Sequence, residues 1–112
     1  MSARIDVQLS VLQTGIHMIA PHPFPFPLGQ IMATPAALEA LRQSQQSAIE
    51  FVLRHASGDW GDLSQSDQRQ NEWAVVHGAR ILSVYHTRQG CCLWVITEAD
   101  RSATTIVLPD DY

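Results

Sequence analysis

With 112 residues, the chain is long enough for one domain and too short for two domains that each bury a core. Apolar residues make up 46% and charged residues 16%, a balance typical of a folded globular protein and not of a disordered chain. The net charge of −4, with arginine as the only basic residue type besides histidine, excludes a surface that neutralises many phosphates, so nucleic acid is not expected as a whole-surface ligand.

The sequence also predicts a compartment. Arg4 and Asp6 interrupt the N-terminus before any apolar run typical of a signal peptide, and no stretch approaches the roughly 20 apolar residues of a spanning helix. Cys91 and Cys92 are adjacent, so on a strand they point to opposite faces and are not suited to a mutual disulfide or a shared metal. We therefore expect reduced thiols, a cytoplasmic location and no membrane partner.

The first segment alternates apolar and polar residues over residues 5–11, which predicts a half-buried strand. Proline then occupies every second position over residues 21–27, which predicts an extended connector. Its Phe24 and Phe26 either pack back on the domain, the interpretation we favour, or dock on a partner. We take residues 1–27 as an N-terminal strand with its connector and residues 28–112 as a single domain.

Three helices are expected in the next part, after a short strand at residues 28–33. Thr34 and Pro35 predict the start of a helix over residues 36–42. Capping-box patterns predict two more helices, one opening at Ser47 and reaching residue 56, the other opening at Ser64 and reaching about residue 77.

The third helix has Trp73 and Val76 as its apolar positions, and we expect these side chains to face the core.

The last part predicts a three-stranded antiparallel meander over residues 80–87, 91–97 and 103–108, because the connecting loops are short. The middle strand is apolar on both faces. It therefore needs cover on both sides, by helices on one side and by the N-terminal segment or a second subunit on the other. The predicted fold class is α+β, with an N-terminal strand, three short helices and the C-terminal meander.

Residues 28–112 also carry a family resemblance, in segments that read LGQIMATP, RH, GDWG, NE, G-x-RILSVY, LWVITEADRSATT and LPDDY. On these segments the chain resembles small bacterial proteins of plasmids and integrative elements that are described as plasmid-related. The resemblance implies an accessory role in a mobile element. It implies no particular enzymatic activity.

The densest polar segment is the predicted turn at residues 97–104. Asp and Ser favour such turns because their side chains bond to nearby amides, and an arginine between acids is a common surface arrangement. In the functional alternative, Glu98 and Asp100 bind a cation or act as acid and base, while Arg101 contacts an anion.

A second candidate combines His55, Asp59 and Trp60. A carboxylate four residues away can orient an imidazole for general-base catalysis, although Gly58 is expected to end the helix between them. A histidine at a helix C-terminus also stabilises the helix dipole without any catalytic role.

Cofactor signals are missing from the sequence. The five histidines show no paired metal-ligand spacing, and no phosphate-binding glycine motif or nucleophile elbow is present. We expect neither a metal nor a cofactor.

These observations favour a non-catalytic accessory protein that binds a protein partner, such as a host defence or nucleic-acid-processing enzyme. The residues assigned to binding are Asp59, Trp60, Glu98, Asp100 and Arg101.

The alternative is a small metal-independent nuclease toxin, in which His or Tyr moves the proton and Arg steadies the phosphate. Its catalytic residues would be His55, Arg80, Tyr85, Glu98 and Arg101. A homodimer formed through the second face of the sheet is compatible with either hypothesis.

Overall fold

The structure is a computed structural model that describes residues 3–4 and 24–112. The strand predicted at residues 5–11 and the connector up to residue 23 lie outside the described residues.

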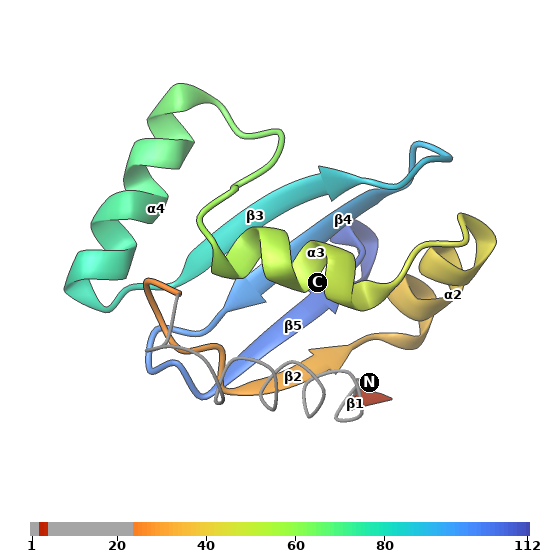
Figure 1. Ribbon diagram of the computed structural model, residues 1–112, viewed down its shortest axis with the longest axis horizontal. Helices are drawn as coiled ribbons and strands as arrows, with labels where there is room; N and C mark the ends of the chain where they lie inside the picture. Colours follow the sequence, from red (N-terminus) through yellow and green to blue (C-terminus); the bar gives the residue numbers. More distant parts are fainter. Residues whose placement is uncertain (1–2, 5–23) are drawn as a thin grey trace, which may run out of the picture.

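The sheet has five strands in the order β1-β2-β5-β4-β3 (Figure 1). They are β1 (Ala3–Arg4), β2 (Gln30–Ala33), β3 (Ile81–His86), β4 (Cys92–Thr97) and β5 (Ala103–Val107). The strands β3, β4 and β5 form the predicted antiparallel meander. The expectation of a simple meander is nevertheless wrong for the whole sheet, because β2 pairs parallel to β5 and makes the sheet mixed. Three helices lie between β2 and β3 in the chain, and this long connection allows β2 to pair with β5, the last strand.

The three helices are α2 (Pro35–Gln43), α3 (Ala48–Ala56) and α4 (Gln65–His77), and a 3-10 turn, η1 (Pro109–Asp111), follows β5. The predicted N-caps are confirmed: Thr34, Ser47 and Ser64 each accept a hydrogen bond from a backbone N–H of the first turn. Each bond satisfies one of the donors that a helix start leaves unpaired.

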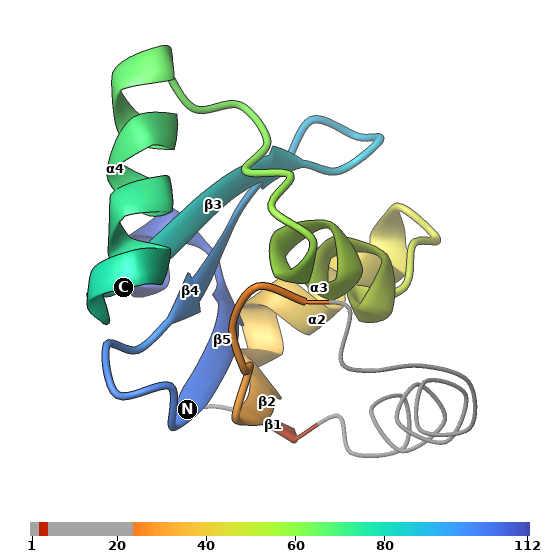
Figure 2. The ribbon, with the colours of Figure 1, turned by 60° about the vertical axis from the view of Figure 1, so that its left-hand side comes forward.

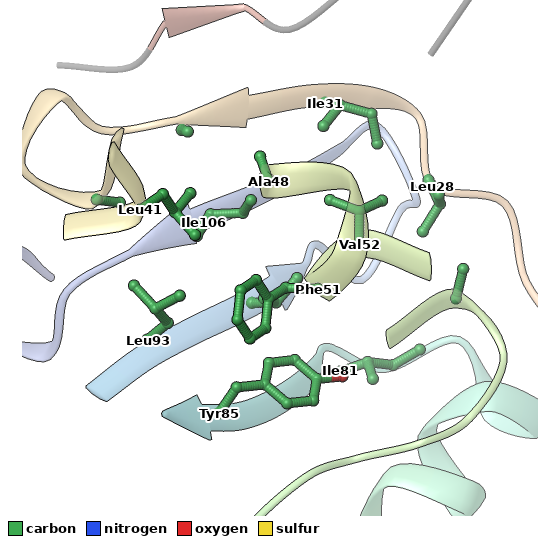
Figure 3. Close-up of a cluster of buried hydrophobic side chains, with 14 of the residues drawn as sticks. Leu28, Ile31, Leu41, Ala48, Phe51, Val52, Ile81, Tyr85, Leu93 and Ile106 are labelled. Carbon is green, nitrogen blue, oxygen red and sulfur yellow. The ribbon is translucent and has the colours of Figure 1, made fainter. Parts of the chain in front are cut away.

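The helices α2 and α3 cover one face of the sheet, and α4 stands beside β3, away from them (Figures 1 and 2). The core lies between the sheet and α2 with α3, as Figure 3 shows. Phe51 and Val52 of α3 point toward the strands and are almost fully buried, and the Phe51 ring lies against Tyr85 at 5.5 Å. Phe26 also packs back on the domain, stacked on Trp60 at 6.2 Å.

The outer edge of β3 is closed by groups that imitate a neighbouring strand. The side-chain amide of Asn71 donates to the Leu82 carbonyl and accepts from the Leu82 N–H. Two residues along, the Val84 N–H donates to the Trp60 carbonyl, and the Asp62 N–H donates to the Val84 carbonyl. An unpaired edge invites aggregation, so these contacts protect the sheet.

The orientation of α4 follows from this edge contact. The helix buries Asn71 and Ala74, whereas Trp73 is 52% exposed and Val76 is 77% exposed. The prediction that Trp73 and Val76 face the core is therefore wrong. Turning either side chain inward would remove Asn71 from the backbone of Leu82, and that backbone would lose both of its partners.

The close approach of residue 61 to β3 generates a stability prediction. Gly61 has a φ of +77°, and a Cβ added there would lie 1.9 Å from the Val84 carbonyl oxygen. Gly90 has a similar φ of +85° with nothing within 4 Å of an added Cβ. We expect Gly90→Ala to lower the free energy of unfolding by about 1–2 kcal/mol through backbone strain alone. Gly61→Ala should cost clearly more, because β3 must also move. Equal losses in urea unfolding would contradict the observed contact.

Candidate functional site

A continuous chain of hydrogen bonds passes through the core from β3 to the start of β2. The His55 ring contacts Ser83 Oγ through Nδ1 at 2.6 Å and Thr97 Oγ1 through Nε2 at 2.8 Å. Thr97 Oγ1 lies 2.7 Å from Thr104 Oγ1, and the Thr104 hydroxyl donates to the Leu28 carbonyl oxygen at 2.7 Å. His55, Ser83, Thr97 and Thr104 are all fully buried.

The direction of this chain is set by its last acceptor, because a carbonyl oxygen cannot donate. Thr104 donates to Leu28, so the hydroxyl of Thr97 donates to Thr104. His55 then donates to Thr97 through Nε2–H, which leaves Nδ1 of the neutral ring to accept from Ser83. The arrangement therefore assigns the Nε2–H tautomer to His55.

The charge state of the ring agrees with this assignment. Burial lowers the pKa of His55 from 6.5 to about 3, because the charged form would lose its hydration. Phe26 and Trp60 border the ring at 5.4 Å and 6.0 Å and help to keep water out. At neutral pH His55 is an uncharged structural group with both ring nitrogens in use.

The carboxylate of Asp59 does not orient His55. Asp59 forms an ion pair with Arg54 at 2.7 Å, and its other oxygen accepts from the Gly61 N–H. The Arg54 guanidinium holds the pKa of Asp59 below its usual range and also lies over the Tyr85 ring at 4.5 Å. The Tyr85 hydroxyl donates to the Asp59 carbonyl, and burial raises the pKa of Tyr85.

Trp60 is a core residue in this structure, since only 5% of it is exposed. Its Nε1–H has no hydrogen-bond partner among the described residues. The binding hypothesis requires Trp60 to be exposed to a partner, and the buried indole does not meet this requirement.

Arg101 joins the β4–β5 turn to the end of α4. Its guanidinium donates to the carbonyls of Ala74 and Ala79 at 2.8 Å and 2.6 Å, and also to the Glu98 carbonyl at 3.1 Å. A cation at the C-terminus of a helix is favourable because the last carbonyls carry partial negative charge. Both terminal nitrogens of the guanidinium thus donate to backbone carbonyls of the protein.

Both acids of this turn contribute to its hydrogen bonds, Asp100 through its side chain and Glu98 through its backbone. The Asp100 carboxylate accepts from the Ser102 N–H, and hydrogen bonding by Ser102 lowers the pKa of Asp100. The backbone of Glu98 closes the turn, accepting from the Arg101 N–H and donating to the Ala103 carbonyl. Arg80 lies elsewhere, with its guanidinium 5.1 Å from the Tyr112 ring centre.

The structure therefore brings together only part of the predicted set. His55 and Arg101 both lie near Phe26, but His55 is buried and Arg101 is bonded to carbonyls. Within the described residues, no group of three or more His, Cys, Asp or Glu side chains is placed to hold a metal ion. The described helices are too short or too polar to cross a membrane.

Ser83 was missed as a partner of His55, and Thr97 and Thr104 were assigned to a surface turn. All three occupy inward, buried positions of their strands. A hydroxyl at an inward position needs a buried partner, and His55 on α3 was the polar group available to provide one.

Comparisons with protein-family models, curated proteins and solved structures found no match for this chain.

The hydrogen bond between His55 and Thr97 is the central one of this series, and it can be tested by removing one hydroxyl. Thr97→Val leaves the Nε2–H of His55 without an acceptor, so we expect the free energy of unfolding to fall by about 2–3 kcal/mol. Thr105→Val is the matched control, because Thr105 lies half-buried on the opposite face of the sheet. It should change stability by less than about 0.5 kcal/mol. Similar losses of unfolding free energy for both variants in urea would contradict the buried chain of hydrogen bonds.

The lowered pKa of His55 also predicts a pH dependence. Between pH 6.5 and about 3, the unfolded chain binds a proton at His55 that the folded chain does not. Stability that is present above pH 6.5 is therefore lost as the pH falls, by about 2–3 kcal/mol between pH 7 and 4.5. Denaturant unfolding at both pH values measures this loss. His55→Gln keeps a donor toward Thr97 and removes the titrating group, so its stability should depend less on pH. An unchanged pH dependence would argue against a buried neutral ring.

Proposed function

We propose that the protein is a non-catalytic interaction protein that binds another protein through the outward face of α4. The observation that carries the proposal is the orientation of this helix. A helix in a monomer normally turns its apolar residues inward, but α4 buries a polar amide and presents an indole and a valine to solvent.

The exposed pair has the composition of a binding surface. Tryptophan is enriched among the residues that dominate protein–protein affinity. Trp73 is also ordered, because the His77 ring stacks on it at 4.3 Å and His77 Nδ1 contacts the Trp73 carbonyl. An aromatic side chain held in place loses little conformational entropy on binding.

The attachment of α4 supports the same function. Asn71 fixes the middle of the helix to β3, and Arg101 fixes its end to the β4–β5 turn. Both attachments are directional and polar, and together with the packing of Ala74 and Val75 they position the helix without using Trp73 or Val76. A partner would meet a preformed surface.

The polar residues considered for catalysis support the non-catalytic part of the proposal. His55, Tyr85 and Arg101 each direct their polar atoms to another group of the protein. No observation specifically favours the nuclease alternative.

The nature of the partner follows from charge and from the resemblance to proteins of mobile elements. A net charge of −4 favours a partner with a basic surface, such as a host defence or nucleic-acid-processing enzyme. The proposed place of action is the cytoplasm, where the free thiols of Cys91 and Cys92 stay reduced.

The test starts from a photo-reactive residue at position 76, which identifies the partner by mass spectrometry after crosslinking in cells. The purified partner is then titrated calorimetrically. We expect Trp73→Ala to weaken binding about 30-fold or more, as for a central aromatic contact. Gln43→Ala, at an exposed position of α2, should leave the affinity unchanged. Equal affinity of wild type and Trp73→Ala would contradict the proposed face.

A direct nuclease assay distinguishes the proposed function from the alternative of a nuclease toxin. The purified chain should leave RNA and DNA intact, and its expression should not arrest growth. Cleavage by the wild type that is abolished by Arg101→Ala, in a variant that still folds, would replace the proposal with the nuclease toxin.

A further inference from the structure

The exposed side of α4 carries a basic side chain in line with its apolar ones. Arg69 lies four residues before Trp73 and seven before Val76, so all three share one face of the helix. All three are exposed, and α4 stands apart from α2 and α3 in both views (Figures 1 and 2). We call Arg69, Trp73 and Val76 the α4 stripe.

The guanidinium of Arg69 has no partner within the described part of the chain. Glu72 lies three residues along α4, a spacing at which ion pairs form, but no ion pair joins the two side chains. The guanidinium groups of Arg42, Arg54 and Arg101, in contrast, each donate to a carboxylate or to backbone carbonyls. Arg69 is therefore a cation that the fold leaves unpaired beside two apolar side chains.

The stack between Trp73 and His77 leaves part of the indole accessible. The two rings lie 4.3 Å apart and within 18° of parallel, so His77 covers one face of the indole. No other ring or guanidinium of the described residues contacts Trp73, which is 52% exposed. A partner can therefore pack an apolar side chain on the indole and reach Arg69 with the next part of its chain.

Acidic residues border the α4 stripe on both sides. Asp67 and Glu72 are exposed and, at about 100° per residue, lie roughly 100–120° around the helix from Trp73, on opposite flanks. Neither carboxylate forms an ion pair among the described residues. The flanks therefore suit a basic surface, in agreement with the net charge of −4, whereas the centre suits an acid.

We propose that the partner contributes a peptide segment in which a carboxylate pairs with Arg69 and a neighbouring apolar side chain packs on Trp73 and Val76. The proposal rests on the partner-binding function of α4 and specifies the chemistry of its contact. A carboxylate meets a guanidinium through two parallel hydrogen bonds, which fixes the position of the segment along the helix. An apolar segment without the acid would cover Arg69 and leave its charge unpaired, which is unfavourable.

Single-stranded nucleic acid also combines anionic groups with rings that stack on an indole. The α4 stripe offers it one arginine, and the carboxylates of Asp67 and Glu72 would lie beside the phosphates and repel them. A protein segment with a single acid avoids this repulsion, so the charges around the α4 stripe favour the peptide.

The test uses a phage-displayed library of random peptides that is selected on the full chain. We expect the enriched peptides to share an Asp or Glu near an aromatic or aliphatic residue. One enriched peptide, labelled with fluorescein, is then titrated by anisotropy, and Arg69→Glu should weaken its binding about tenfold or more. Arg42→Glu is the matched control, because it changes the net charge equally at an exposed site on α2, and it should change binding by less than about twofold. A peptide with Lys in place of the acid should bind Arg69→Glu better than the wild type.

The outcomes separate this inference from the proposed function. Peptides that require Trp73 but bind wild type and Arg69→Glu equally would overturn the acidic contact and leave the binding face intact. Peptides that are unaffected by Trp73→Ala, or a library from which no peptide is enriched, would overturn both. Binding of a fluorescein-labelled uridine oligonucleotide that is lost in both Trp73→Ala and Arg69→Glu would replace the peptide segment with single-stranded nucleic acid.

Discussion

The hydrogen-bond chain through His55 is the constraint on which the rest of the fold depends. One imidazole on α3 connects Ser83 of β3 to Thr97 of β4, and Thr104 of β5 continues the chain to the carbonyl of Leu28, just before β2. Apolar contacts also hold α3 against the sheet, and the alternation of apolar side chains already favours one register. These directional bonds allow one register, because a one-residue shift of any strand would turn its hydroxyl to the opposite face.

The same use of polar groups explains where a function can reside. Arg101 and Asn71 form hydrogen bonds that fix α4 in place. The ion pair between Arg54 and Asp59 fixes the loop before α4. The helix is held by these polar contacts and by the packing of Ala74 and Val75, and Trp73 and Val76 remain available at the surface. The polar groups considered for catalysis are thus directed to other groups of the protein, and α4 is the surface that we propose for recognition.

Local signals in the sequence were sufficient for the helices and the meander. Thr34, Ser47 and Ser64 marked the helix starts, and the short glycine-containing turns marked the antiparallel pairing. The parallel pairing of β2 with β5 has no local signal, since it joins residues about seventy positions apart. The face of α4 was also unpredictable from periodicity, because a polar amide replaced an apolar side chain as the inward contact. For the candidate site, the residue types were recognised, but only the packing could reveal that His55 is buried.

The most direct test of this account is the state of the His55 ring in solution. Nitrogen-15 NMR of the imidazole distinguishes the two tautomers and the charged form. The account predicts a neutral ring protonated at Nε2, with no titration between pH 8 and 5, because burial lowers the pKa of His55 to about 3. A ring that titrates near 6.5, or that carries its proton on Nδ1, would show that the chain of hydrogen bonds is not formed as described. His55 would then again be a candidate for proton transfer.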